Sequence, residues 1–416
     1  MMKYGLDDRP GVGATLLYGM QWLMICIPVV LTSTFIAPEG EVVFFTQKLF
    51  ALCGLTIVAQ VLFGHKMPLV AGPAAVLLMG VIAAATQGHA ASTIYPSMIV
   101  GGALVVLVAV CGAMKYLQRL FTPRIVASIV ILISFTMAKP IVGLIFSDDE
   151  HSLLAFVMAI GGVVIMAWAN RVLRGVWKSM VVIVAMLLGA LIYYAIAGFP
   201  TSFVKDSAEP QLLLKGMRLD VGVVLSFIFC YIALLINQVG SVQSFGDMLG
   251  ASDMGKRQTR GLIATGISNV VSGVMGVPGA VDYSLSPGVV ASTSCASRYT
   301  ILPAAVAMIL LSLFPQAVAV LLTIPEPVMG VVLLYLMATQ VAAGLNLMQT
   351  TQAATSFQDG LTLGIPIMFT VVLSFMPQEA MAVISQMLRP IVGNSFVMGI
   401  IVVIILEHII LRKSNK

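Results

Sequence analysis

The chain has 416 residues, of which 59% are hydrophobic and 9% are charged, and its formal net charge is +5. A mean hydropathy of +1.04 excludes a water-soluble globular protein and indicates a membrane protein with many spans. The small positive charge gives no reason to expect a nucleic-acid partner. No metal-ligand cluster, phosphate loop or nucleophile with a base is visible, so we expect neither a cofactor nor an enzyme.

Fourteen apolar runs are long enough to cross, or half-cross, a bilayer. In chain order they are Val12–Ala37, Val42–Gly64, Pro68–Thr86, Tyr95–Met114, Ile125–Phe146, Ser152–Asn170, Val176–Gly198, Val221–Gln243, Gly261–Gly276, Gly288–Ser297, Tyr299–Ile324, Val328–Met348, Gly360–Met376 and Ile391–Leu411. The sequence therefore predicts an all-α polytopic protein with fourteen transmembrane segments.

Lysine and arginine are distributed unevenly between the two sides of this arrangement. If the amino terminus is cytoplasmic, sixteen of the 22 lysines and arginines lie in cytoplasmic loops or termini and four in external loops. Lys48 and Lys139 lie within spans. Cytoplasmic loops carry an excess of these residues, so the split supports an even number of spans. We expect a multi-pass protein of the cell (inner or plasma) membrane with both termini in the cytoplasm.

The third run begins with residues that do not favour a continuous helix. Gly72 and Pro73 precede Ala74 and Ala75, where a helix can begin. Non-helical backbone at membrane depth survives only where protein buries it or a wet cavity faces it. A half-helix beginning here directs its electropositive amino end and free amides into the membrane. The amides of Ala74 and Ala75 are therefore candidate substrate ligands.

A second interruption lies between Val277 and Arg298, with two prolines, two glycines, an aspartate and many hydroxyls. Ser286 can cap a helix whose first residue is Pro287, giving a half-helix from about Gly288. We expect short extended strands before both half-helices. Two broken segments at corresponding places indicate the substrate site of a transporter. The candidates from this stretch are Ser284, Leu285, Ser286 and Gly288.

The two halves of the chain resemble each other. Gly54–Gly64 matches Gly266–Gly276 in spacing and hydropathy, and each run precedes one broken segment. These are the second and ninth runs, seven apart, so the halves enter the membrane in opposite senses. The pattern predicts an inverted repeat of seven plus seven segments.

Four motifs resemble those of the nucleobase/ascorbate transporter family, the uracil, xanthine and purine permeases. Leu285–Gly288, Thr293 and Ser297–Arg298 match the glycine, threonine and Ser-Arg spacing of the family signature, but not its first two polar positions. The other three matches are Leu17–Trp22, with Trp22 in place of a histidine, Gly64–Pro68 before Gly72-Pro73, and Gln243–Leu249, with Gln243 in place of a glutamate.

The resemblance implies a core domain, residues 1–122 and 221–324, that moves against a gate domain, residues 123–220 and 325–416. It also implies cation-coupled uptake, by protons or sodium, and a homodimer formed through the gate domain. By analogy, Gln21 and Gln243 are substrate-binding candidates. Helix packing is the alternative for both side chains.

Two carboxylates are candidates for coupling to a cation. Asp247 suits a protonation or cation switch, unless it lies at the cytoplasmic interface near Lys256 and Arg257. Asp282 either compensates for Leu285, which cannot form hydrogen bonds through its side chain, or lies exposed at the outer rim. Alternation along a strand directs Asp282 and Leu285 to opposite faces.

Together these observations predict a secondary transporter that binds a small solute between the third and tenth segments. The first candidate function is uptake of a nucleobase such as uracil or a purine by proton or sodium symport with alternating access. The second is transport or exchange of an anion such as bicarbonate, sulfate or a dicarboxylate, because two helix amino ends without a fixed carboxylate suit an anion. An uncoupled facilitator is a third.

Overall fold

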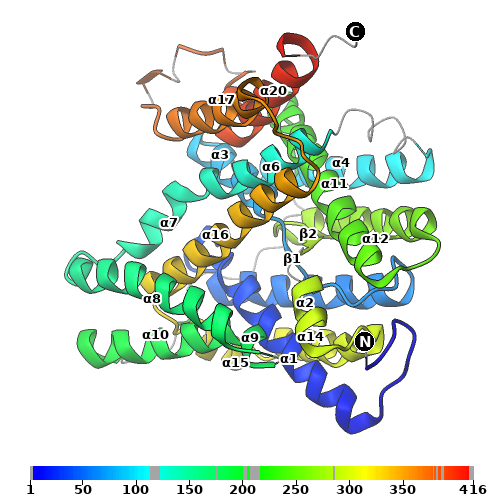
Figure 1. Ribbon diagram of the computed structural model, residues 1–416. Coiled ribbons are helices and arrows are strands. Elements are labelled where there is room, and N and C mark those ends of the chain that lie inside the picture. Colours follow the sequence, from blue (N-terminus) through cyan, green and yellow to red (C-terminus); the bar gives the residue numbers. More distant parts are fainter. Residues whose placement is uncertain are drawn as a thin grey trace.

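The computed structural model describes residues 3–112, 122–174, 176–199, 204–206, 216–283, 286–377, 379–380, 383–385 and 388–411. Within these ranges the chain is almost entirely helical, with one short pair of strands near the centre of the molecule (Figure 1).

Eight helical segments of the described chain are long and apolar enough to cross a membrane. They are α1 (Val12–Leu31) with η1 (Thr34–Ile36), α2 (Val42–Leu62), α4 (Ala91–Val110), α6 (Pro123–Thr136) with α7 (Ala138–Ile145), α8 (Ser152–Val172), α11 (Val221–Leu249), α16 (Glu326–Thr350) and α17 (Phe357–Ser374). A ninth is bent and consists of η2 (Arg298–Ile301) and α14 (Leu302–Leu313), followed by α15 (Pro315–Leu321).

The remaining segments are shorter or more polar. Three are short apolar helices: α3 (Ala75–Thr86), α10 (Val181–Ala197), which follows α9 (Val176–Ser179), and α20 (Ser395–Ile405) with η3 (Leu406–Ile410), which follows α19 (Arg389–Val392). The last two are α12 (Met254–Met275) and α13 (Ser286–Thr293). Each of the fourteen predicted segments thus corresponds to one helical segment, which confirms the predicted fold class.

Some boundaries differ from those predicted. Helix α11 continues six residues beyond Gln243, and α12 begins at Met254, seven residues before the predicted Gly261. Charged residues end an apolar run but do not end a helix, so both helices extend past the apolar stretch. The predicted segment Tyr299–Ile324 is bent in the structure, because the chain turns by 105° between α14 and α15. Pro315 restricts Phe314 to an extended conformation (φ −114°, ψ 91°), which ends α14.

The two interrupted segments meet as predicted. Strand β1 (Ala71–Pro73) pairs antiparallel with β2 (Ala280–Asp282), so that Ala71 faces Asp282 and Pro73 faces Ala280. Helices α3 and α13 follow these strands directly. Pro73 ends the strand and does not begin the helix, whose first residue is Ala75. The strand pair places the starts of both half-helices in one region of the molecule.

Two close helix packings reflect the inverted repeat. The second segment, α2, packs on the eleventh, α14, and the ninth segment, α12, packs on the fourth, α4. In the repeat, the second segment corresponds to the ninth and the fourth to the eleventh, so the two packings are equivalent. At the first packing, a Cβ on Gly54 would lie 2.8 Å from the carbonyl oxygen of Ala305. At the second, a Cβ on Gly266 would lie 2.8 Å from the carbonyl oxygen of Gly102. The matched glycines therefore occupy equivalent close contacts, as the repeat predicts.

Candidate substrate site

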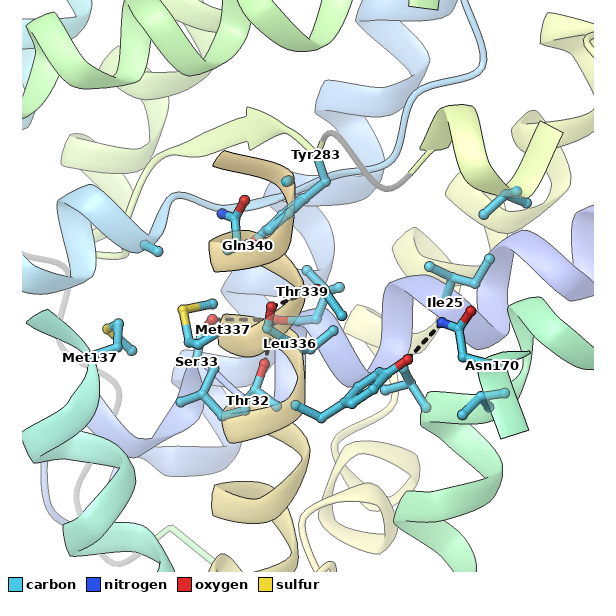
Figure 2. Close-up of a pocket in the computed structure, with 18 of the residues that line it drawn as sticks. Ile25, Thr32, Ser33, Met137, Asn170, Tyr283, Leu336, Met337, Thr339 and Gln340 are labelled. Atoms are coloured by element: carbon cyan, nitrogen blue, oxygen red, sulfur yellow. Dashed lines mark hydrogen bonds between the residues drawn. The ribbon is translucent and has the colours of Figure 1, made fainter. Parts of the chain in front are cut away.

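A cavity of about 300 Å³ lies beside the starts of the two half-helices (Figure 2). Its walls come from α1, α3, α13 and Tyr283 on one side and from Met137, α8, α9, α10 and α16 on the other. The lining is mostly aliphatic, with a few hydroxyl and amide groups, as is usual for a small-molecule site. Its polar or aromatic members are Thr32, Ser33, Asn170, Lys178, Tyr283, Tyr335, Thr339 and Gln340.

The start of α3 reaches this cavity, although only one of the two predicted amides is available. The amide of Ala74 donates to the carbonyl oxygen of Gly279 at 2.8 Å, so it belongs to the strand pair. Ala75 lines the cavity, and as the first residue of α3 it has an amide with no partner inside the helix. In α13, Gly288 lies in the first turn, next to the cavity-lining Val289.

Ser286 connects the two broken segments and does not face the cavity. It is fully buried, accepts a hydrogen bond from the amide of Val70 at 2.9 Å, and donates to the carbonyl oxygen of Tyr283 at 3.1 Å. Its hydroxyl is therefore engaged within the protein and away from the cavity lining, and its role in substrate binding stays a prediction. Ser284 and Leu285 lie outside the described residues.

Tyr283 and Gln340 offer the chemistry that a planar heterocycle requires, and sequence reasoning missed both (Figure 2). The hydroxyl of Tyr283 donates to the carbonyl oxygen of Pro73 at 2.6 Å, which holds the ring at the cavity wall. Gln340 lies within α16 and brings a carboxamide with both donors and an acceptor. An amide in the middle of an apolar span was the available signal for Gln340.

The other polar groups of the cavity are partly engaged with one another or with nearby backbone. The hydroxyls of Thr32 and Ser33 both donate to the carbonyl oxygen of Val29, each at 3.2 Å. The side-chain amide of Asn170 donates to the hydroxyl of Tyr335 at 2.7 Å. Among the described lining residues there is no carboxylate, and Lys178 supplies a positive charge.

Gln243 and Asp247 pair with each other instead of lining the cavity. The Gln243 amide nitrogen donates to Asp247 Oδ1 at 2.7 Å, and its oxygen accepts from Gln258 at 2.6 Å. Asp247 is exposed in the last turn of α11, close to the start of α12 that carries Arg257. The structure therefore supports the interfacial alternative for Asp247. Gln21 is buried in α1 but is also absent from the described lining.

Asp282 is buried, not exposed at the outer rim as one alternative predicted. Its side chain is 1% exposed and contacts His65 and Gln238. Strand alternation directs it to the face opposite Tyr283, away from the cavity lining. It therefore lies behind the candidate site, separated from it by the strand backbone.

Comparison with known proteins agrees with this architecture. A family model for xanthine/uracil permeases, described as the permease family, matches residues 13–379. The chain is 22% identical to the xanthine permease of Bacillus subtilis (strain 168), over 93% of this chain and 93% of that protein. It is 24% identical to the uracil permease of Bacillus caldolyticus, over 82% of this chain and 81% of that protein.

Solved structures extend the comparison to the fold. The transmembrane domain of a cyanobacterium bicarbonate transporter, BicA, superposes with a TM-score of 0.64 at 15% identity, covering 86% of this chain and 95% of that one. SLC26A9 superposes with a TM-score of 0.58 at 12% identity, covering 94% of this chain and 65% of that one. At these identities the likeness concerns the fold alone. By the family match and the fourteen helical segments of its described residues, this chain belongs to the xanthine/uracil permease family of membrane transporters and is not an enzyme.

Proposed function

We propose that this transporter takes up a nucleobase through the cavity between the half-helix starts and α16. The observation that carries the proposal is the strand pair, which brings the first turn of α3 and the start of α13 to one cavity lined by Tyr283 and Gln340. The curated relatives named xanthine and uracil permeases support this substrate class.

Each part of the cavity matches one property of a nucleobase. The ring of Tyr283 offers a flat surface on which a planar base can stack. The carboxamide of Gln340 pairs with the adjacent donor and acceptor that nucleobases carry on their edges. The amide of Ala75 donates to a base carbonyl, assisted by the electropositive start of α3.

Replacement of Gln340 by alanine is expected to weaken nucleobase binding by about 1–3 kcal/mol, roughly fivefold to 150-fold in Kd, because polar groups of the base lose their partner. Calorimetric titration of the purified protein measures this change. Gln349→Ala is the matched control, since Gln349 lies on the same helix but is exposed and outside the described lining. Equal affinity of Gln340→Ala and the parent protein would remove Gln340 from the site.

Transport or exchange of an anion remains the second candidate, supported by one feature of the cavity. Lys178 and two helix amino ends contribute positive potential, and the described lining contains no carboxylate. Thermal unfolding in the presence of competing solutes separates the two functions, because a ligand that binds the folded state raises its melting temperature. We expect uracil, xanthine or another purine to raise it. A rise with bicarbonate, sulfate or a dicarboxylate, and none with the bases, would favour the anion carrier.

The packing supports the division into a core and a gate domain. The helices assigned to the core contact one another extensively, as α4 does with α12 and α2 with α14. Those assigned to the gate do the same, with α16 on α6, α7 and α8. The cavity lies where the two groups meet, so movement of one group past the other would expose the bound solute to alternate sides.

We place the transporter in the cell membrane, with both termini in the cytoplasm and uptake coupled to a proton or sodium gradient. Homodimerisation through the gate domain is also proposed. Only 17% and 22% of the residues in the most apolar parts of α8 and α17 are buried, so these faces are open to lipid or to a second copy. Since Asp247 is exposed and already paired with Gln243, the buried Asp282 is the better coupling carboxylate.

A further inference from the structure

We propose that His65, Gln238 and Asp282 form a proton-binding site behind the strand pair, and that the proton bound there is the coupling ion. This inference rests on the proposed uptake function and assigns its coupling step to residues outside the substrate cavity. The three residues come from the segment between α2 and β1, from α11 and from β2.

The Asp282 carboxylate is only partly supplied with hydrogen-bond donors. Its Oδ2 accepts a hydrogen bond from the side-chain amide of Gln238, whose own oxygen accepts from the Asp282 backbone amide at 3.0 Å. Its Oδ1 is buried and has no hydrogen-bond partner among the described residues. A buried polar atom without a partner is costly, more so when it carries charge. Oδ1 is therefore the atom at which a proton relieves that cost.

His65 faces the same carboxylate but does not neutralise it. Its Nδ1 accepts a hydrogen bond from the amide of Met67 at 3.0 Å, so Nδ1 carries no proton in this arrangement and Nε2 is the ring nitrogen that faces the carboxylate. Nε2 lies 3.0 Å from Asp282 Oδ2, although its direction is not that of a regular hydrogen bond. Both residues are almost completely buried. An ionised Asp282 would thus remain as a buried charge without a compensating cation.

Other charged groups on the surrounding elements do not change this result. Arg257 donates to the carbonyl oxygens of His65, at 2.9 Å, and Lys66, at 3.4 Å, and not to the carboxylate. Among the described residues, His65 is the one basic side chain within 4.0 Å of Asp282. The remaining titratable or charged groups on the elements packed around β2 are Lys48, Cys53, Lys66, Cys230, Tyr231, Asp247, Asp253, Lys256, Arg257, Arg260 and Tyr283.

The atoms that contact the Asp282 carboxylate suit a proton better than a sodium ion. A sodium ion requires several oxygen ligands, whereas the contacts at Oδ2 are nitrogens, from Gln238 and His65, that present hydrogens. The described His, Cys, Asp and Glu residues contain no group of three that could hold a metal ion. The site therefore fits a proton, which needs one free oxygen and no coordination shell.

Its position explains how proton and substrate occupancy are linked. Asp282 pairs with Ala71 across the strands, and the next residue, Tyr283, lines the cavity. A change of charge at Asp282 alters its attraction to Gln238 on α11, and so the placement of the strand that carries Tyr283. If the bound proton and the solute favour the same position of this strand, proton binding raises the affinity of the cavity for the solute. By linkage, solute binding then raises the affinity of Asp282 for the proton by the same factor.

Proteoliposomes containing Asp282→Asn test this proposal, because asparagine has the shape of the protonated carboxyl but cannot release a proton. With uracil and xanthine as labelled probes, we expect exchange of internal for external base to persist and accumulation driven by a pH gradient to be lost. Asp247→Asn is the matched control and should retain both. His65→Asn is a second test, since its side-chain oxygen can still accept from Met67. It should keep exchange but weaken accumulation, because the carboxylate loses the imidazole that lies 3.0 Å from it.

Each outcome has a separate meaning. Accumulation by Asp282→Asn at the parent level, or parent accumulation that follows a sodium gradient and not a pH gradient, would overturn the assignment. If Asp282→Asn does not fold, unchanged pH-driven accumulation by His65→Asn would overturn it. If the parent protein carries neither these bases nor other purines, the proposed function fails first, before the coupling site is reached.

Discussion

Arg124→Met is expected to lower the free energy of unfolding by about 3–5 kcal/mol, because it leaves buried carboxylates without their cation. Arg124, at the start of α6, lies 3.1 Å from Glu407 in η3 and 3.3 Å from Asp359 in α17. It also donates to the carbonyl oxygen of Ala353 at 2.6 Å. Asp359 and Glu407 are both buried. One arginine thus joins three segments at the end of the proposed gate domain that is predicted to be cytoplasmic.

Thermal and chemical unfolding of the purified protein in detergent measures this loss. Glu407 still accepts a hydrogen bond from the hydroxyl of Thr122, at 2.9 Å, which does not neutralise its charge. The double variant Arg124→Met with Glu407→Gln should therefore recover part of the stability, because it removes a charge that has lost its partner. Arg171→Met, at an exposed arginine in α8, is the control and should change stability little. A melting temperature for Arg124→Met equal to that of the control would contradict the proposed cluster.

Gly266→Val is expected to destabilise the protein by about 3 kcal/mol, since the packing of α12 on α4 leaves no room for a side chain. A Cβ at this position would lie 2.8 Å from the carbonyl oxygen of Gly102 and 2.9 Å from the amide nitrogen of Val106. Both neighbours are backbone atoms of α4, so the helices must move apart. The melting temperature and the yield of folded protein should both fall.

The repeat provides an internal test of this prediction. Gly54→Val should have a similar effect, because a Cβ there would lie 2.8 Å from the carbonyl oxygen of Ala305 in α14. Gly240 in α11 is the control, since a Cβ at that position would meet nothing within 4 Å. Normal stability of both Gly54→Val and Gly266→Val would argue against these close helix packings. A large effect at Gly54 and none at Gly266 would argue against their equivalence in the repeat.

Gln243 and Asp247, predicted as site residues, lie away from the described cavity for a definable reason. The motif around Gln243 and Asp247 has recognisable spacing, but spacing does not reveal how far a helix continues beyond the apolar run. In the structure α11 extends to Leu249, which leaves Asp247 exposed in its last turn. Gln238, five residues earlier, is the amide that contacts the buried Asp282. The position of Gln238 within an apolar run gave no sign that it contacts Asp282.

Composition and residue order determined that this protein lies in a membrane, where the helical segments of the described residues fall, and that the segments after Gly72-Pro73 and Ser286-Pro287 are interrupted. A bilayer imposes span length, and proline and glycine interrupt helices locally, so these features are readable along the chain. Only the tertiary structure decided that Tyr283 and Gln340 share a cavity and that His65 meets Asp282. Such contacts join residues far apart in the chain, and helix length, rotation and strand register set them, none of which follows from local pattern.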